Sequence, residues 1–134
     1  MKALRPSITD ERTFVEHVDG VLRPAGYRMI GAFDDDSEGG ETDEPPTAVS
    51  GFRVSHNFAY GHYLYVEDTS TLPAARGKGH ARGLLDWLAE EAQRGGCAEM
   101  HLSSGVGENR ASAHRLYFNA GLRIVAYHFA RTFP

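Results

Sequence analysis

Residues 62–94 constrain the fold most, because a strand pattern, a glycine-bearing basic turn and an amphipathic helix follow one another directly. Residues 62–72 alternate β-branched and aromatic side chains with polar ones, which predicts a strand. Residues 80–94 predict a helix, with one apolar side formed by Ala81, Leu84, Leu85, Leu88 and Ala92. Strand, glycine turn and helix in this order are typical of an α/β fold.

The turn between them, Arg76 to His80, is poor helix material, since it combines glycines with cations that a helix N-terminus disfavours. Gly77 and Gly79 would let backbone N–H groups face outward with no Cβ in the way of an anion. Two interpretations remain: an anion site on the first helical turn, or a basic solvated turn. A Walker-type loop is excluded, since Lys78 is followed by glycine, and the G-x-G-x-x-G spacing is absent as well.

The rest of the chain predicts further strands and helices in alternation. We expect a helix over 9–26, capped by Thr9 or Asp10, and another over 109–120, ended by Gly121. Gly95 and Gly96 should end the helix that begins at residue 80. The other strands are predicted at 2–8, 27–33, 47–58, 98–103 and 122–133. Neighbouring middle strands can pair as hairpins, so we expect one domain over 1–134, with a mixed sheet of about six strands flanked by helices.

Charge is distributed unevenly. Residues 34–46 hold seven of the 18 acidic residues and no basic one, which predicts an exposed surface loop. The rest of the chain therefore contains 11 acidic and 14 basic residues, a small basic surplus. This surplus suits a small anion and is too slight to argue for nucleic acid.

No stretch has the length of a membrane span, and the N-terminus lacks an apolar signal core, so we expect a cytoplasmic protein. Cys97 is the single cysteine, which excludes an internal disulfide.

Other reactive side chains carry less information. None of the seven histidines forms a helical i, i+4 pair with another, so we expect no metal site. His114 is either a proton relay to Tyr117, one turn later, or a histidine satisfied by local hydrogen bonds. We expect Cys97 to be a small buried apolar residue and Trp87 to be a packing residue.

Two motifs together resemble the GNAT family of N-acetyltransferases. Their acyl-CoA signature, Q/R-x-x-G-x-G/A, is matched at 76–81 by Arg-Gly-Lys-Gly-His-Ala. A second motif, an Asn followed by a helix ending in Y-x-x-x-G and an apolar residue, is matched by Asn109, Tyr117, Gly121 and Leu122. The resemblance covers about residues 48–129. Residues 69–71 depart from it, because Thr, Ser and Thr stand where the family usually has apolar side chains, and the acidic loop is longer than a tight turn.

The resemblance implies acetyl-CoA as cosubstrate, without a metal. Backbone amides from Gly77 to Ala81 would hold the pyrophosphate, the strand at 70–72 would run along the pantetheine arm, and Asn109 would contact that arm. Tyr117 would lie near the sulfur. The implied cofactor-binding residues are Ser70, Thr71, Leu72, Arg76, Gly77, Lys78, Gly79, His80, Ala81 and Asn109.

The chemistry requires a base for the acceptor amine, a donor for the developing oxyanion and a proton for the departing thiolate. Glu67 or Asp68 is the candidate base; because neighbouring strand residues alternate, we expect only one of them to face the cleft. A backbone N–H near Thr71 is the oxyanion donor, and Tyr117 the proton donor. Both acids also fit a strand-end role, and Tyr117 a packing role.

The resulting prediction is direct transfer of an acetyl group to a primary amine of a small molecule or a protein, without an acyl-enzyme. Glu67, Asp68 and the acidic loop favour a cationic acceptor. The alternative is a non-catalytic acyl-CoA-binding module on the same fold. The apolar final strand is a candidate for pairing between two copies in a homodimer.

Overall fold

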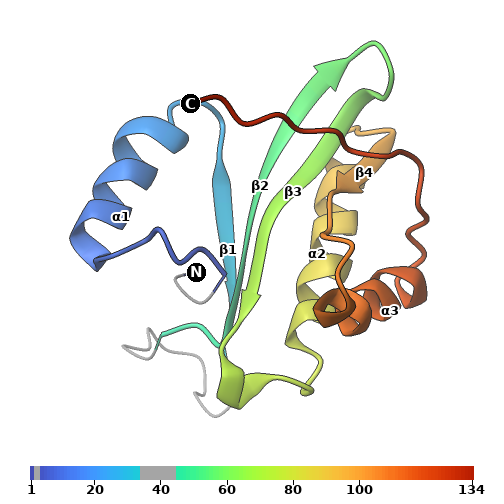
Figure 1. Cartoon of the computed structure of the whole chain (residues 1–134). Helices are drawn as coiled ribbons and strands as arrows, with labels where there is room; N and C mark the ends of the chain where they lie inside the picture. Colours follow the sequence, from blue (N-terminus) through green and yellow to red (C-terminus); the bar gives the residue numbers. More distant parts are fainter. Residues whose placement is uncertain (2–3, 34–44) are drawn as a thin grey trace. The chain divides into compact units, whose positions relative to one another are not determined.

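A computed structural model describes residues 1, 4–33 and 45–134, which form two compact units, 1–102 and 103–134. The first unit contains α1 (Glu11–His17), a π-helix (Val18–Leu22), β1 (Arg28–Ala32), β2 (Ala48–Asn57), β3 (Gly61–Thr71), a 3₁₀ turn (Pro73–Ala75), α2 (His80–Arg94) and β4 (Glu99–Leu102) (Figure 1). The second unit contains a 3₁₀ turn (Glu108–Arg110) and α3 (Ala111–Asn119). Most of the acidic segment 34–46 lies outside the described residues, so its predicted loop is not addressed further.

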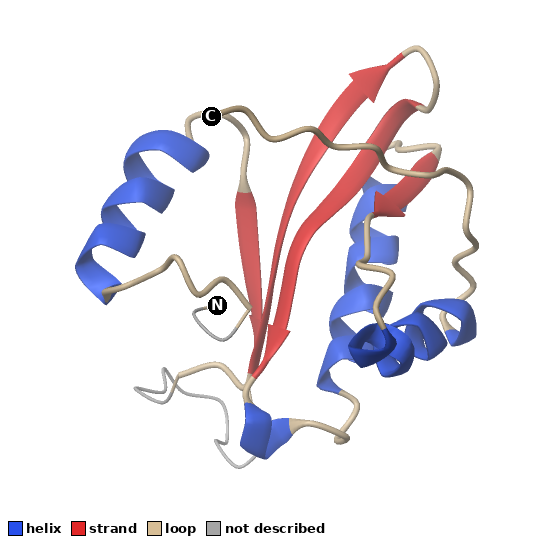
Figure 2. Ribbon diagram, viewed as in Figure 1, coloured by secondary structure: helices blue, strands red, loops and turns tan. Residues whose placement is uncertain are grey.

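The sheet is mixed, with strand order β1-β2-β3-β4 (Figure 2). The first three strands pair antiparallel, and β4 pairs parallel with β3. A β-bulge interrupts the β2–β3 ladder, because Gly51 pairs with Asp68 while the next residue, Phe52, pairs with Val66. Glu67 is therefore the extra residue in β3. The ladder with β4 ends where Val66 meets Leu102, so β3 extends beyond β4 by residues 67–71.

The mixed sheet agrees with the sequence prediction, but the described residues form four strands in place of about six. Residues 4–8, part of the expected first strand, form turns in which the amides of Leu4 and Arg5 both donate to the carbonyl of Met1. Residues 122–134 form neither helix nor strand, although Ile124, Tyr127 and other large apolar residues there are exposed. Strand propensity alone does not supply the neighbouring backbone that a strand needs.

The core lies between one face of the sheet and α2, which runs alongside β3 and β4 in Figure 1. Its buried residues are Phe52, Leu64, Val66, Leu88 and Ala92. They come from alternate strand positions and from the predicted apolar side of the helix, so both periodicities are confirmed. Trp87 packs edge-on against Phe52, with ring centroids 6.1 Å apart, in agreement with a packing role.

The predicted helix boundaries are largely confirmed. Asp10 caps α1, because its Oδ1 accepts a hydrogen bond from the Thr13 amide at 2.8 Å. The helix α2 ends at Gly95 and Gly96, and α3 ends before Gly121, as the glycines indicated. The expected helix over 9–26 is shorter than predicted: it becomes a π-helix after His17, and none of its residues is buried. Within the described ranges, no helix has the length and apolar character required to span a bilayer.

Candidate functional site

The turn between β3 and α2 has the geometry that its glycines predicted. Arg76 is extended, and Gly77 and Gly79 have φ values of +79° and +85°, a region that side chains with a Cβ rarely adopt. Gly79 directly precedes α2 and has no side chain, so it gives this 15-residue helix no side-chain cap. A Cβ at either glycine would stand in open space. The two glycines therefore leave room for an anion beside the start of α2.

The basic side chains of the turn differ in their surroundings. Arg76 and Lys78 are exposed, whereas Arg82 forms an ion pair with Asp86 one helical turn later, at 2.9 Å. His80 and Ala81 are half-buried at the start of the helix. Arg76 and Lys78 therefore remain the best placed of the predicted cations to meet an anion at the turn.

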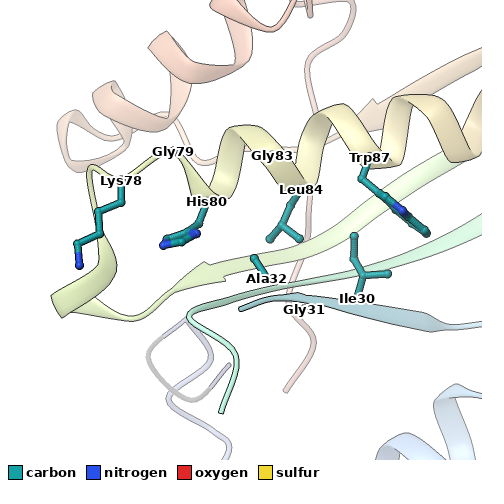
Figure 3. Close-up of a pocket in the computed structure, with 9 residues that line it drawn as sticks. All are labelled: Ile30, Gly31, Ala32, Lys78, Gly79, His80, Gly83, Leu84 and Trp87. Carbon is teal, nitrogen blue, oxygen red and sulfur yellow. The ribbon is translucent and has the colours of Figure 1, made fainter. Parts of the chain in front are cut away.

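A pocket of about 470 Å³ lies between this turn, the first half of α2 and the strand β1. Figure 3 shows His80 at the start of the helix, with Lys78 at one end of the pocket and Trp87 at the other. Its walls are apolar except near the turn; the lining residues are Ile30, Gly31, Ala32, Lys78, Gly79, His80, Gly83, Leu84 and Trp87. The pocket places apolar surface beside the glycine turn.

Ser70, Thr71 and Leu72 lie where β3 has passed the end of β4. Towards β2, Ser70 pairs with Val49 and Thr71 with Ala48, and the Leu72 amide donates to the Thr47 carbonyl at 2.8 Å. Towards β4, no strand of the described chain pairs with this segment. That edge consequently offers backbone groups to an extended ligand.

The hydroxyl groups that depart from the family pattern have a structural explanation at Thr69. Its Oγ1 lies 2.8 Å from Oγ of Ser50, its fully buried partner on β2. The two hydroxyls satisfy each other, so a polar residue at position 69 does not leave a buried donor without a partner.

Glu67 and Asp68 lie on the same face of the sheet, opposite α2. Glu67 Oε1 lies 2.8 Å from Nε of Arg53, and Asp68 Oδ2 accepts a hydrogen bond from the Tyr27 hydroxyl at 2.9 Å. The expectation that only one of the two carboxylates faces this side is wrong, because the bulge at Glu67 breaks the alternation of the strand.

Both carboxylates are also neutralised by arginines. Arg5 approaches Asp68 Oδ1 through Nε at 2.9 Å and Nη2 at 2.8 Å, while Arg53 holds Glu67. The two acids therefore add no net negative charge to this face, which weakens the argument for a cationic acceptor. Burial, followed by the hydrogen bond to Asp68, raises the pKa of the Tyr27 phenol above that of an ordinary tyrosine.

Asn109 and Tyr117 belong to the unit 103–134, whereas the other predicted site residues belong to 1–102. Asn109 lies in the 3₁₀ turn before α3, and Tyr117 lies half-buried in the helix. His114 Nε2 lies 2.7 Å from the Gly105 carbonyl and 3.1 Å from Ser104 Oγ. These contacts favour the interpretation of His114 as a locally satisfied residue.

Sequence reasoning missed Arg5, Tyr27 and Arg53, which contact the carboxylates. Tyr27 and Asp68 are 41 residues apart, and nothing in their local sequence indicates that they meet. Gly51 was a weaker signal, since a glycine inside a strand often marks a bulge or a close approach. Among the described residues, no group of three or more His, Cys, Asp or Glu side chains is arranged to hold a metal ion.

The family model for the acetyltransferase (GNAT) family matches residues 4–121. The chain belongs to this family. An uncharacterized N-acetyltransferase of Bacillus subtilis, YhdJ, is 25% identical over 132 residues, which cover 98% of this chain and 85% of the relative. The predicted α/β GNAT fold is thus confirmed, with fewer strands than expected.

Solved structures share the fold at lower identity. An aminoglycoside N-acetyltransferase, AAC(6')-Iy in complex with CoA, superposes with a TM-score of 0.75 at 16% identity, covering 98% of this GNAT chain and 82% of that one. A transcriptional regulator from Bacillus halodurans gives a TM-score of 0.73 at 19% identity, covering 92% and 77%. A putative acetyltransferase from Agrobacterium tumefaciens gives 0.70 at 22% identity, covering 93% and 80%.

Proposed function

We propose that this GNAT protein is an acetyl-CoA-dependent N-acetyltransferase, which transfers an acetyl group directly to a primary amine of a small molecule or a protein. We further propose that residues 1–134 act as one GNAT domain. The observation that carries the proposal is the open glycine turn before α2, which gives the helix no side-chain cap, beside the free edge of β3, in a chain of this family. AAC(6')-Iy, which has the same fold, is in complex with CoA in its solved structure.

The residues of the turn fit the anionic part of coenzyme A. Backbone amides from Gly77 to Ala81 would bind the pyrophosphate, and Arg76 and Lys78 would add positive charge beside it. Ser70, Thr71 and Leu72 would orient the pantetheine arm through main-chain groups on the free edge of β3. When bound, acetyl-CoA supplies the acetyl thioester.

The remaining roles concern protons. One carboxylate of the pair Glu67 and Asp68 would accept the proton that a neutral-pH amine carries, because only the unprotonated amine is nucleophilic. The Tyr117 hydroxyl would return a proton to the departing sulfur, and Asn109 would bind the coenzyme arm. A backbone N–H near Thr71 would donate to the oxygen on which negative charge develops.

Coenzyme A binding tests the turn. Coenzyme A at about 100 times its dissociation constant should stabilise the wild-type protein by about 2.7 kcal/mol, measured as a rise in melting temperature. Gly79→Asp should abolish this rise, because it places a negative charge where phosphate binds. Gly79→Asn carries a side chain of similar size without the charge, and Gly20→Asp carries the charge at an open position away from the turn. A folded Gly79→Asp protein that coenzyme A stabilises as much as the wild type would contradict the proposal.

A second candidate function is a non-catalytic acyl-CoA-binding module. The ion pairs that occupy both candidate carboxylates favour it, since a general base must release its partner to take a proton. Acetyl-CoA-dependent thiol release, measured with a polyamine, an amino sugar and a lysine-containing peptide, separates the two functions. Amine-dependent release supports the transferase, whereas coenzyme binding without release on any acceptor supports the module.

A further inference from the structure

Arg5 and Tyr27 converge on the bulge of β3 from two different segments. Arg5 belongs to the turns that precede α1, and Tyr27 lies between the π-helix and β1. Besides its contacts with the Asp68 carboxylate, Arg5 donates from Nη2 to the Glu67 carbonyl at 3.2 Å. One arginine therefore contacts both residues of the bulge, and a buried tyrosine contacts one of them from the side of β1.

Both oxygens of the Asp68 carboxylate are engaged. Oδ1 accepts from Arg5 and Oδ2 accepts from Tyr27, and the side chain is 17% exposed. A proton added to either oxygen would disrupt one of these hydrogen bonds. Tyr27 as a whole residue is 4% exposed, so its hydroxyl has little freedom to turn to another acceptor. These hydrogen bonds fix the Asp68 side chain and, through it, the position of the bulge.

Glu67 is held differently. Its Oε1 lies 2.8 Å from Nε of Arg53, an ion pair whose geometry does not make a hydrogen bond. The side chain is 32% exposed, about twice as much as that of Asp68. Arg53 itself lies against the Tyr27 ring, 5.8 Å from its centroid, so the same tyrosine supports both sides of the bulge. Glu67 is thus the more exposed of the two carboxylates, while Arg5 holds its backbone carbonyl.

We propose that Asp68 is an anchor, that Arg5 and Tyr27 are positioning residues acting through it, and that Glu67 alone accepts the amine proton. This division of roles rests on the proposed acetyltransferase function. It assigns distinct tasks to two neighbouring carboxylates that a plain strand would place on opposite faces. The bulge makes the assignment possible, and the contacts of Arg5 with both bulge residues keep it from shifting along the strand.

The anchor is tested without any substrate, by spectrophotometric titration of the tyrosines in the free protein. The wild-type protein should contain a tyrosine that ionises at higher pH than a model tyrosine, and Tyr27→Phe should remove it. Asp68→Asn should lower the pH at which Tyr27 ionises, because the charge and the acceptor are lost. Tyr60→Phe, outside this network, is the matched control. Loss of the high-pH tyrosine in Tyr60→Phe, or an unchanged titration in Asp68→Asn, would overturn the anchor.

The roles are tested by steady-state kinetics with acetyl-CoA and whichever amine of the polyamine, amino sugar and peptide panel gives turnover. Glu67→Gln should lower kcat about 100-fold or more, the range for loss of a general base. Asp68→Asn and Tyr27→Phe should each lower kcat about 10-fold with the KM for acetyl-CoA unchanged, and Arg5→Lys should retain more activity than Arg5→Met.

Each kinetic outcome either supports or overturns the division of roles between Glu67 and Asp68. A larger loss in Asp68→Asn than in Glu67→Gln would overturn the division of roles, and so would equal kcat values for Tyr27→Phe and Tyr60→Phe. Absence of wild-type turnover on every amine of the panel would overturn the proposed function and the role of Glu67 with it. In that case the tyrosine titration still decides separately whether Asp68 is the anchor.

Discussion

Gly51→Ala should destabilise this protein far more than an ordinary glycine-to-alanine change. Gly51 is buried in β2 directly below Tyr27, and a Cβ built there would overlap the hydroxyl oxygen and Cζ of the tyrosine and approach Cε2 to 2.7 Å. The obstacle is a ring whose hydroxyl is held by Asp68, so a small rotation cannot relieve the overlap. The tyrosine must leave its site or the strands must separate.

The magnitude follows from what Tyr27 would lose. An expelled tyrosine re-exposes about 150–250 Å², which at about 25 cal/mol per Å² corresponds to about 4–6 kcal/mol. The ring can keep part of its contacts at the surface, so we expect a loss of about 4 kcal/mol in the free energy of unfolding. That is a large share of the roughly 5–15 kcal/mol that stabilises a typical domain.

Urea unfolding of four proteins measures this cost: wild type, Gly51→Ala, Tyr27→Ala and the double variant. If the ring is the obstacle, Gly51→Ala should cost less than about 1 kcal/mol in the Tyr27→Ala background, a coupling of about 3 kcal/mol. Gly83→Ala, in open space on α2, is the control and should stabilise by about 0.5–1 kcal/mol. Equal costs of Gly51→Ala in both backgrounds would refute the steric argument.

Three further expectations concern local features. Hydrogen bonds from the Thr13 backbone and hydroxyl lower the pKa of Asp10, so its stabilisation of α1 is present above pH 3.8 and lost as the pH falls through the lowered pKa; Asp10→Ala should reduce the difference in unfolding free energy between pH 7 and pH 3. Burial raises the pKa of the Cys97 thiol, so its reaction with a disulfide reagent at pH 8 should be slower than that of free cysteine and should speed up in urea. Gly121→Ala, at a φ of +86°, should cost about 1 kcal/mol in urea unfolding, and an unchanged midpoint would contradict the strain.

The features that sequence predicted are those fixed by short-range geometry. The turn before α2, its uncapped start and its glycine end depend on residues within a few positions of one another, and so does the cap at Asp10. The apolar side of α2 and the alternation of β2 and β3 were predicted for the same reason. Caps, turns and helix ends of this kind can be predicted from a single sequence.

The features that sequence missed depend on distant partners. The bulge at Glu67 arises from the pairing of β3 with β2, and the anchoring of Asp68 needs Arg5 and Tyr27, each more than 40 residues away. The two strands that were expected at 2–8 and 122–133 are absent from the described residues for a related reason, since their residue types favour a strand but do not specify a neighbour.

The extra residue in β3 also shifts the phase of the strand. Up to Val66 the even-numbered residues face α2, whereas beyond the bulge Thr69 and Thr71 share a face with Ser50 and Ala48, on that same side. An alignment of this chain with a relative that lacks the extra residue must therefore place its one-residue gap at the bulge. A gap elsewhere in the strand would align residues that face opposite sides of the sheet. Such a relative would present on this face only the carboxylate equivalent to Asp68, the one that Arg5 and Tyr27 contact.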